Sequence, residues 1–505
     1  MNSKQDLDLS SLSTASAMFQ GYNNVTAQAL NTAVEGSITK NSGVSELQYK
    51  VTKSLQEIYQ SLNISSSVSA GYAGFSGEAK VNLVNQLNLT KESLCIVIKA
   101  SDKQDIYRTN NVSIKSGIKL PTSEKEVNDF VRAYGDSYIS ELATGAEYYA
   151  VYAFICETKE QRFALETQFS ASGISLSGGS LSADFKAQIE KVSKSSSSTV
   201  TFQQIVSGLK NPNLPDQNNI IQYALDFFDK EIDNPAIISY TSTSYDHVPN
   251  FPADVLNQVR KNVNYFTDPT GNFTKKGIDV DNLKNQCENL NLIYNFYKFH
   301  ADKKLLDVLE LAKSDLAKLK TQQNDYSFNP NQVFILPELP SLNDGKPVLQ
   351  FSFINSDLHG GSGGAVFNDV NQTSYFQKRT RLVNLKLRSG AYIDRITSTF
   401  ENSDPTNSIY ILEHGGNGGN QSFDLELTPG ISLKSITGRS GAKVDQLSFE
   451  ASNGQKISGG GNGGDPFSFL IPEGYFVAGF RGQSGSLIDR IGVVYAKLLP
   501  ASWDK

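Results

Sequence analysis

The feature that most restricts the fold of this chain is a sequence unit that occurs three times in its last third. The glycine-rich loops HGGSGG, HGGNGG and GGGNGG begin at His359, His414 and Gly459. A second motif, SGxxxD, recurs in LRSGAYIDRI, GRSGAKVDQL and GQSGSLIDRI. A short strand-rich unit cannot bury its apolar face alone, so three copies predict one domain of pseudo-threefold symmetry in which each unit packs against the other two.

The two motifs together resemble those of the jacalin-like lectins. Residues 348–498 carry the resemblance, and it implies a β-prism of three four-stranded sheets that binds sugars without metal. It also implies how the motifs combine. Asp489 would work with the loop at 359–364, Asp394 with the loop at 414–419, and Asp445 with the loop at 459–464.

The chemistry of sugar binding suits these residue types. An exposed aspartate accepts hydrogen bonds from two adjacent hydroxyls, and glycines let backbone N–H groups approach the ring. Tyr392 could stack on a sugar, which favours the first copy. The alternative is that each aspartate only caps a tight turn. The candidate carbohydrate-binding residues are Gly390, Tyr392, Asp394, Gly441, Asp445, Gly485, Asp489, Gly360, Gly361, Gly415, Gly416, Gly460 and Gly461.

Two stretches in the first half, about residues 49–88 and 157–206, have a clean period for neither helix nor strand. They contain SVSAGYAGFSGEAKV and SASGISLSGGSLSADFKAQ, in which serine, glycine and alanine dominate. Such residues leave the helical and extended states within a few kcal/mol of each other. The second stretch carries both patterns: a helical face (Leu181, Phe185, Ile189, Val192) and a strand-like alternation (Phe163, Leu165, Thr167, Phe169, Ala171).

Between these stretches lies YGDSYISELATGAEYY, residues 134–149. It resembles the signature of the membrane attack complex/perforin (MACPF) family, which has Tyr-Gly, two further residues, an aromatic residue, six intervening residues and then two glycines. The matching positions are Tyr134, Gly135, Tyr138, Gly145 and Ala146. Asp136 and Ser137 replace the usual Thr/Ser-His, and Ala146 replaces the second glycine.

This resemblance implies an α+β domain, with a bent antiparallel sheet and flanking helical clusters, ahead of the all-β prism. It implies that both stretches refold into β-hairpins, and that several copies of the chain close a shared β-barrel in the target membrane. Gly135, Gly145 and Ala146 would form the hinge. The expected partners are membrane lipid, a cell-surface glycan or glycoprotein receptor, and further copies of the chain. Bacterial proteins that join these two domain types are often secreted toxins, some insecticidal.

A non-lytic protein is the alternative. In that case the perforin-like half serves adhesion or scaffolding, and the two stretches are solvated surface hairpins. The altered residues of the signature, Asp136, Ser137 and Ala146, are the reason to consider it.

Composition argues against several other classes. A net charge of -6, from 46 basic and 52 acidic residues, gives no support to a nucleic-acid partner. We expect Cys95, Cys156 and Cys287 to be free and mostly buried. The scattered histidines predict no metal site, and GGSGG lacks the strand-to-helix setting of a nucleophile elbow. We therefore expect no cofactor and no enzyme.

The beginning of the chain, MNSKQDLDLSSLSTASAMF, has no apolar core of a secretory signal. We expect a soluble monomer, secreted or released without an evident signal peptide, that acts at the target membrane. No run of apolar residues is long enough for a membrane-spanning helix.

The predicted organisation is a pore-forming domain at 1–328, a proline-rich linker at 329–347, the prism at 348–498 and a tail at 499–505. Helices are expected at 46–62, 123–134 and 281–323, and strands at 94–100 and 146–156. The helix at 123–134 begins with a capping box formed by Ser123 and Glu126.

Overall fold

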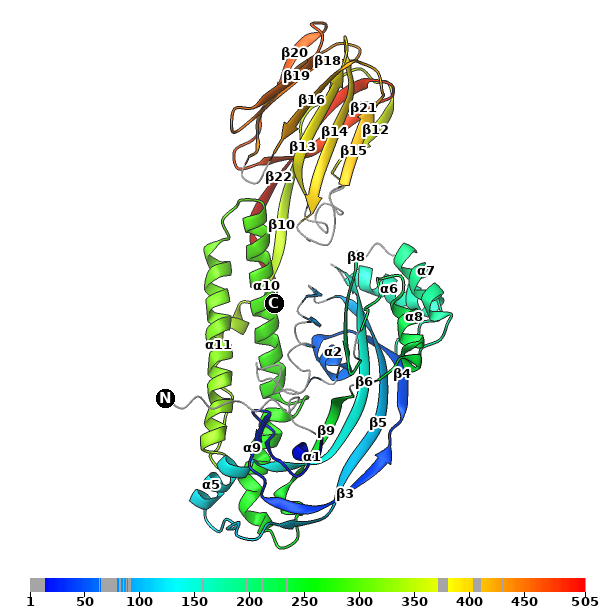
Figure 1. The fold of residues 1–505 in the computed structure, drawn as a ribbon. Coiled ribbons are helices and arrows are strands. Elements are labelled where there is room, and N and C mark those ends of the chain that lie inside the picture. The colour runs from blue at the N-terminus through cyan, green and yellow to red at the C-terminus, as the bar shows by residue number, and fades with distance from the viewer. Residues whose placement is uncertain are drawn as a thin grey trace. The chain divides into compact units, whose positions relative to one another are not determined.

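The computed structural model describes residues 14–504 apart from 63, 65–79, 81–82, 85, 88, 90–91, 157–158, 196–198, 210–211, 233–234, 371–379, 403–409 and 428–430. The chain forms two compact units (Figure 1). Unit 1 contains residues 1–285 and 310–343, and unit 2 contains residues 286–309 and 344–505. The unit boundaries fall inside two long helices, α10 (Asn272–Phe296) and α11 (Lys303–Phe328).

In the described residues, unit 1 is built on one nine-stranded antiparallel sheet with order β2-β1-β6-β5-β4-β7. Strand β3 also pairs with β5, and both β8 and β9 pair with β6. Its strands are β1 (Gly21–Asn23), β2 (Gln28–Leu30), β3 (Val34–Ser42), β4 (Ser45–Thr52), β5 (Leu94–Ile114), β6 (Ser137–Ile155), β7 (Gly179–Ser180), β8 (Thr199–Ser207) and β9 (Ala236–Ser244). Among the described residues of this unit, the other α-helices are α1 (Thr14–Ala17), α2 (Leu55–Ser61), α5 (Glu124–Tyr134), α6 (Lys159–Ala171), α7 (Phe185–Ser195), α8 (Ile220–Leu225) and α9 (Asn257–Thr267).

Both faces of the central strands are covered. On one face, alternate residues of β5 and β6 such as Ile96 and Tyr148 pack against apolar side chains of α6, α7 and α8. On the opposite face their neighbours, such as Val97 and Tyr149, pack against α2 and Leu83, Val84 and Leu87. Strands that are buried on both faces need a continuous apolar run, which is why Leu94–Ala100 carries one. Both predicted strands exist and are longer than expected, because their polar continuations pair with β3 and β9.

The sheet changes partners at Gly145 and Ala146. Strand β6 pairs with β9 up to Gly145 and with β8 from Glu147 onward. On the other side, β5 pairs with β4 up to Asp102 and with β3 from Asp105. A Cβ at Gly145 would stand 1.9 Å from the Asp102 carbonyl oxygen, so only glycine fits here. Figure 1 shows the long strands curving along their length.

The stretch at 157–206 is mostly helical in the structure. Helix α7 buries Phe185, Ile189 and Val192, which confirms the helical prediction for these three residues. Leu181 is also buried, but it lies before the helix begins. The strand-like alternation of residues 163–171 is instead part of α6, where Leu165 and Phe169 face the core. The end of the stretch is already a strand, since β8 pairs with β6 from Thr199 to Ser207.

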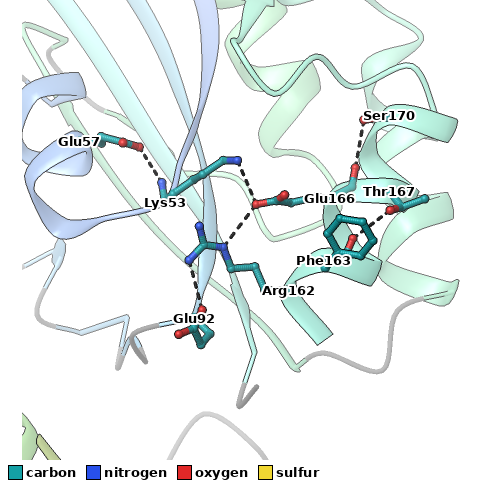
Figure 2. A network of polar contacts seen from close by, with 8 residues as sticks. All are labelled: Lys53, Glu57, Glu92, Arg162, Phe163, Glu166, Thr167 and Ser170. Atoms are coloured by element: carbon teal, nitrogen blue, oxygen red, sulfur yellow. Dashed lines mark hydrogen bonds and ion pairs between the residues drawn. The ribbon is translucent and has the colours of Figure 1, made fainter. Parts of the chain in front are cut away.

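Charged side chains hold α6 against the strand ends (Figure 2). Lys53 Nζ lies 2.9 Å from Glu166 Oε1, and Arg162 bridges Glu166 at 3.3 Å and Glu92 at 3.2 Å. Each pair is partly exposed, so each contributes little alone, although a chain of four alternating charges acts as a network. The network therefore orients α6 more than it stabilises the unit.

Half of the stretch at 49–88 lies outside the described residues, so its predicted refolding segment is described only in part. Its beginning differs from the expected helix at 46–62, because residues 45–52 form β4 and only residues 55–61 form a helix. Lys80 is buried and its Nζ lies 2.8 Å from Glu147 Oε1 and 4.5 Å from the ring centre of Tyr149. This ion pair joins the stretch to β6 directly after Ala146.

A third cluster of buried side chains joins α5, α9, the base of α10 and α11, and the proline-rich segment. Ser123 caps α5 as predicted, accepting from the Glu126 N–H, and Gly135 ends the helix with φ 82°. The predicted helix at 281–323 is two helices, with a break between Phe296 and Lys303. The segment predicted as a linker packs Phe334, Leu336 and Leu339 against this cluster.

Asp136, one of the altered signature residues, is fully enclosed beside this cluster. It accepts hydrogen bonds from the Asn24 backbone N–H at 3.2 Å, from Asn24 Nδ2 at 2.7 Å and from the Tyr326 hydroxyl at 2.8 Å. Burial raises the pKa of Asp136 from 3.8 to about 6, although these donors oppose the shift. Of the other signature residues, Tyr138 is buried and Tyr134 packs at the edge of the cluster.

Unit 2 is a β-prism of three antiparallel sheets. Their orders are β10-β22-β21-β12 with β11 beside β22, β15-β14-β13-β16, and β19-β18-β17-β20. The strands are β10 (Lys346–Asn355), β11 (His359–Gly360), β12 (Ala365–Asn368), β13 (Thr380–Ser389), β14 (Ile393–Asn402), β15 (Tyr410–Gly415), β16 (Gln421–Glu426), β17 (Leu433–Ser440), β18 (Val444–Ala451), β19 (Lys456–Gly460), β20 (Asp465–Phe469), β21 (Phe476–Ser484) and β22 (Ile488–Asp504). One core contains side chains from all three sheets.

The ends of the prism differ from the prediction. The residues expected to form a tail are the end of β22, which pairs with β10. Strand β10 begins at Lys346, so the last two residues of the expected linker also belong to the prism. The tip of α10 belongs to the same unit, where the Tyr297 hydroxyl donates to the Thr380 carbonyl at 2.9 Å. Cys95, Cys156 and Cys287 are all free and buried, as predicted.

The raised pKa of Asp136 predicts a pH-dependent stability. Between pH 4 and 6 the folded state holds a proton at Asp136 that the unfolded chain has lost, so this group stabilises the fold less as pH rises. The Asp136→Asn variant is neutral throughout. We expect its stability relative to the wild type to increase by about 1–3 kcal/mol between pH 4 and pH 7, measured by urea unfolding. A difference that stays constant or shrinks over this range would contradict the assignment.

Candidate carbohydrate-binding site

Each glycine-rich loop of the prism surrounds the carboxylate of one aspartate. The loop at 414–419 lies at Asp394, the loop at 459–464 at Asp445, and the loop at 359–364 at Asp489. The structure thus brings together the three pairs expected from the sequence, while their role in binding sugar stays a prediction. All three aspartates are largely buried, with exposed fractions of 7%, 7% and 1%.

Within each loop the last pair of glycines lies nearest the carboxylate, whereas the first pair was named as the candidate. The candidates Gly390, Gly441 and Gly485 border the carboxylates as well, since a Cβ there would stand 3.6, 3.8 and 3.8 Å from Oδ2. A Cβ at Gly418 would stand 2.2 Å from Asp394 Oδ1, and a Cβ at Gly419 would stand 2.5 Å from Oδ2. The same holds at Asp445 and Asp489, so the residues that sequence reasoning missed are Gly363, Gly364, Gly418, Gly419, Gly463 and Gly464. The repetition of a second GG pair in every loop was the available signal.

The predicted first glycines hold the backbone of the site instead. The N–H groups of Gly361, Gly416 and Gly461 donate to the backbone carbonyls of Asp489, Asp394 and Asp445 at 2.9, 2.9 and 2.8 Å. Gly360, Gly415 and Gly460 precede them with φ of 122°, 102° and 100°, and a Cβ there would meet the same carbonyls. These residues fix each loop next to its aspartate without reaching the carboxylate.

The SGxxxD motif forms a tight connection between two strands in every copy. The N–H groups of Gly390, Gly441 and Gly485 each donate to the carbonyl two residues on, at 3.0 Å. A register shift lies just before each of these glycines, between Arg388 and Ser389 in the first copy. The bulge and the turn together direct the aspartate toward its loop.

Arginines donate hydrogen bonds to all three loops from outside, in the loop at 359–364 from Arg490 Nε to the Gly361 carbonyl at 2.6 Å. Arg388 Nε donates to the Gly418 carbonyl at 2.6 Å, and Arg439 Nε donates to the Gly463 carbonyl at 3.0 Å. The third copy has Gln483 at this place. The bonds from Arg388 and Arg439 engage the glycine that lies against the carboxylate, so they hold the loop in the position that forms the site.

The three sites touch one another in a ring. A Cβ at Gly361 would stand 2.3 Å from the carbonyl oxygen of Ala442. A Cβ at Gly416 would stand 2.7 Å from the carbonyl oxygen of Ser486, and a Cβ at Gly461 would stand 2.7 Å from the carbonyl oxygen of Ala391. Each loop therefore contacts the SGxxxD turn of another copy. Tyr392 follows Ala391, so it lies where the Asp394 turn meets the loop of Asp445 and is not a feature of the first copy alone.

The carboxylates differ in what they contact. Lys443, from the second copy, forms an ion pair with Asp489 Oδ1. Among the residues that the structure describes, Asp394 and Asp445 have no ion-pair partner. Over the same described residues, no group of three or more His, Cys, Asp or Glu side chains is placed to hold a metal ion. What these two carboxylates offer is charged hydrogen-bond acceptors beside exposed glycine backbone, an arrangement suited to hydroxyl groups.

A glycine at the carboxylate should be harder to replace than a glycine elsewhere. Gly419 (φ +68°) and Gly454 (φ +86°) both have a left-handed backbone, but a Cβ at Gly454 has no neighbour within 4 Å. We expect Gly454→Ala to lose about 1 kcal/mol of stability and Gly419→Ala at least about 1 kcal/mol more, because its Cβ must displace Asp394. Thermal unfolding measures both losses. Equal losses would show that the two loop glycines and the aspartate carboxylate, which we call the cradle, are not closely packed.

Comparisons with known proteins agree with this geometry. The family model for the Jacalin-like lectin domain matches residues 356–494. Horcolin from Hordeum vulgare is 30% identical over 137 residues, which are 26% of this chain and 90% of horcolin. The residues matched by the family model lie within unit 2.

Solved structures were also found for this region. A wild-type Malaysian banana lectin is 25% identical, with 30% of this chain and 99% of the lectin covered and a TM-score of 0.25. AcmJRL, a mannose-binding jacalin-related lectin from Ananas comosus, is 27% identical, with 29% and 98% covered and a TM-score of 0.24. On the match to horcolin, this chain belongs to the jacalin-like lectin family through its C-terminal domain.

Proposed function

We propose that the prism binds glycans at Asp394 and Asp445. The observation that carries this proposal is the cradle at each of these residues, a buried carboxylate between two close glycines with no ion-pair partner among the described side chains. Vicinal hydroxyls of a sugar would donate to the two carboxylate oxygens, and the glycines leave room for the ring beside the loop. Mannose is the first sugar to test, because the pineapple relative is named as mannose-binding.

Removing the charge of these two aspartates should remove glycan binding. A hydrogen bond to a charged group contributes about 1.5–3 kcal/mol, so Asp394→Asn and Asp445→Asn should each weaken their own site by about 10–100-fold. Binding to a mannose surface, measured by surface plasmon resonance, should fall for each and be lost in the double variant.

The matched control is Asp504→Asn, an exposed aspartate that pairs with Lys346 at the end of β22 away from the loops. It should bind as the wild type does. If the double variant kept wild-type binding to mannose and to a panel of other glycans, the proposed sites would be wrong.

A second function, pore formation by unit 1, is favoured by the place of the two small-residue stretches. Helices α6 and α7 cover one face of the central strands, and Leu83, Val84 and Leu87 lie on the other. The charge network in Figure 2 and the pair of Lys80 with Glu147 tie these stretches to the sheet. Residues 157–206 are long enough for two strands of about 9–11 residues each, the length that crosses a bilayer.

In this proposal the prism attaches the chain to a glycan on a membrane, copies assemble into a ring, and the two stretches leave the sheet faces and insert as β-hairpins. Gly145 and Ala146 lie where β6 changes partners, so they are the proposed hinge. No described helix is both long enough and apolar enough to cross a bilayer. A lectin without lytic activity remains the competing function.

A disulfide can test whether the second stretch must move. Gln48 on β4 and Ser180 on β7 are exposed, directly paired residues. Paired antiparallel residues have Cα atoms about 4.5–5.5 Å apart, which suits a disulfide. We expect the oxidised Gln48→Cys/Ser180→Cys variant to lose release of calcein from phosphatidylcholine vesicles that carry a mannosylated lipid, and dithiothreitol to restore it.

The native cysteines are buried, and Gln48→Cys alone serves as the control that should leak under both conditions. An oxidised variant with a verified disulfide that leaks like the wild type would show that this stretch does not leave. A wild type that binds the vesicles without leakage would favour the non-lytic lectin.

A further inference from the structure

The three candidate sites share one backbone but present different side chains to one another. The residue two places after the glycine of each SGxxxD motif is Tyr392 in the first copy, Lys443 in the second and Leu487 in the third. The ring of contacts brings Tyr392 next to the loop of Asp445, Lys443 next to the loop of Asp489, and Leu487 next to the loop of Asp394. Each site is therefore completed by a residue of another copy.

Lys443 enters the site that it borders. Its Nζ forms an ion pair with Asp489 Oδ1 and lies 3.3 Å from the position that a Cβ on Gly363 would take. Gly363 is one of the two glycines that touch the carboxylate, so the ammonium group stands inside the cradle. It occupies the place where a sugar hydroxyl would donate to Asp489.

The burial of Asp489 makes this contact hard to displace. The Asp489 side chain is 2% exposed, whereas the Lys443 side chain is 36% exposed. Burying an unpaired charge is costly, so the ammonium group stabilises this carboxylate, and hydrogen bonds between two charged groups are stronger than those from neutral hydroxyls. A neutral sugar would have to replace the ammonium with weaker donors.

We propose that Lys443 closes the Asp489 site from within the chain, so that only the Asp394 and Asp445 sites bind neutral sugars. Lys443 thereby sets both the number of sites and which loops face the glycan. This inference rests on the proposed glycan-binding function. The chain also offers its own design for opening the site, because the third copy has the uncharged Leu487 at the same place.

Crystals of the full chain soaked in methyl α-mannoside locate the sugar directly. We expect it at Asp394 and Asp445 in the wild type, with Asp489 paired to Lys443. In Lys443→Leu we expect a third sugar at Asp489. Sugar at Asp489 in the wild type, or no sugar there in a well-folded Lys443→Leu, would overturn the proposal while leaving the proposed function intact.

A gain of binding provides the second test. The Asp394→Asn/Asp445→Asn variant should not bind a mannose surface, and adding Lys443→Leu should restore one site, at least about tenfold tighter than the binding that remains without it. Since Asp489 loses its partner in this variant, its thermal unfolding is compared with that of the parent. A folded triple variant without restored binding would contradict the proposal.

A measurement without sugar separates the two proposals if the wild type binds no glycan. Acetic anhydride should modify Lys443 several-fold more slowly than the exposed Lys456, and Asp489→Asn should remove this protection, as read by mass spectrometry. If Lys443 reacts as quickly as Lys456 in the wild type, the site is not closed. If it is protected but no sugar binds anywhere, the closed site stands and the proposed function fails.

Discussion

The prism depends on one constraint: no single sheet of the repeat can bury its own apolar face. Leu385, Leu447 and Phe480, one from each sheet, belong to the same core. The seams between sheets repeat as well. The rings of His359 and Phe467 stack with their centres 4.5 Å apart, and those of His414 and Phe367 stack with their centres 3.8 Å apart. In the third seam Gly459 lies against the ring of Phe423. Because every seam ends in a glycine-rich loop, closing the core also brings each loop against the SGxxxD turn of another sheet.

The same constraint explains why equal backbones need not give equal sites. Threefold packing sets the turn of one copy against the loop of another, so a substitution in one motif acts at the site of a different motif. Tyr392, Lys443 and Leu487 occupy one structural place and offer an aromatic ring, a cation and an aliphatic chain. Symmetry supplies three similar backbone sites, and we propose that these side chains decide what each site can accept.

The three-sheet fold of the prism could be predicted from the sequence because its motifs are short and occur three times. Loops and aspartates could be paired from their motifs, whereas the contact of Lys443 with Asp489 could not, since it joins two copies that no single motif connects. In unit 1 the strand at 45–52 was missed because Leu47, Val51 and Leu55 also fit a helical period. Pairing with β5 and β7 decided between the two patterns.

The capped helix at 124–134 was predictable because Ser123 and Gly135 fix its ends locally. The ion pairs that tie the small-residue stretches to the sheet were not, because Lys80 and Glu147, like Lys53 and Glu166, are far apart in the sequence. These contacts give unit 1 a central sheet with both faces covered by segments of weak intrinsic preference. In the proposed function the prism attaches the chain to a glycan, and unit 1 contains the segments proposed to move.

The central claim is that glycans bind at the cradles of Asp394 and Asp445. Hydrogen exchange of the full chain, followed by mass spectrometry with and without methyl α-mannoside, tests it most directly. The account predicts slower exchange in the loops at 414–419 and 459–464 and in the turns at 390–394 and 441–445, with the loop at 359–364 unchanged. Protection confined to 359–364, or found only outside the prism, would contradict it.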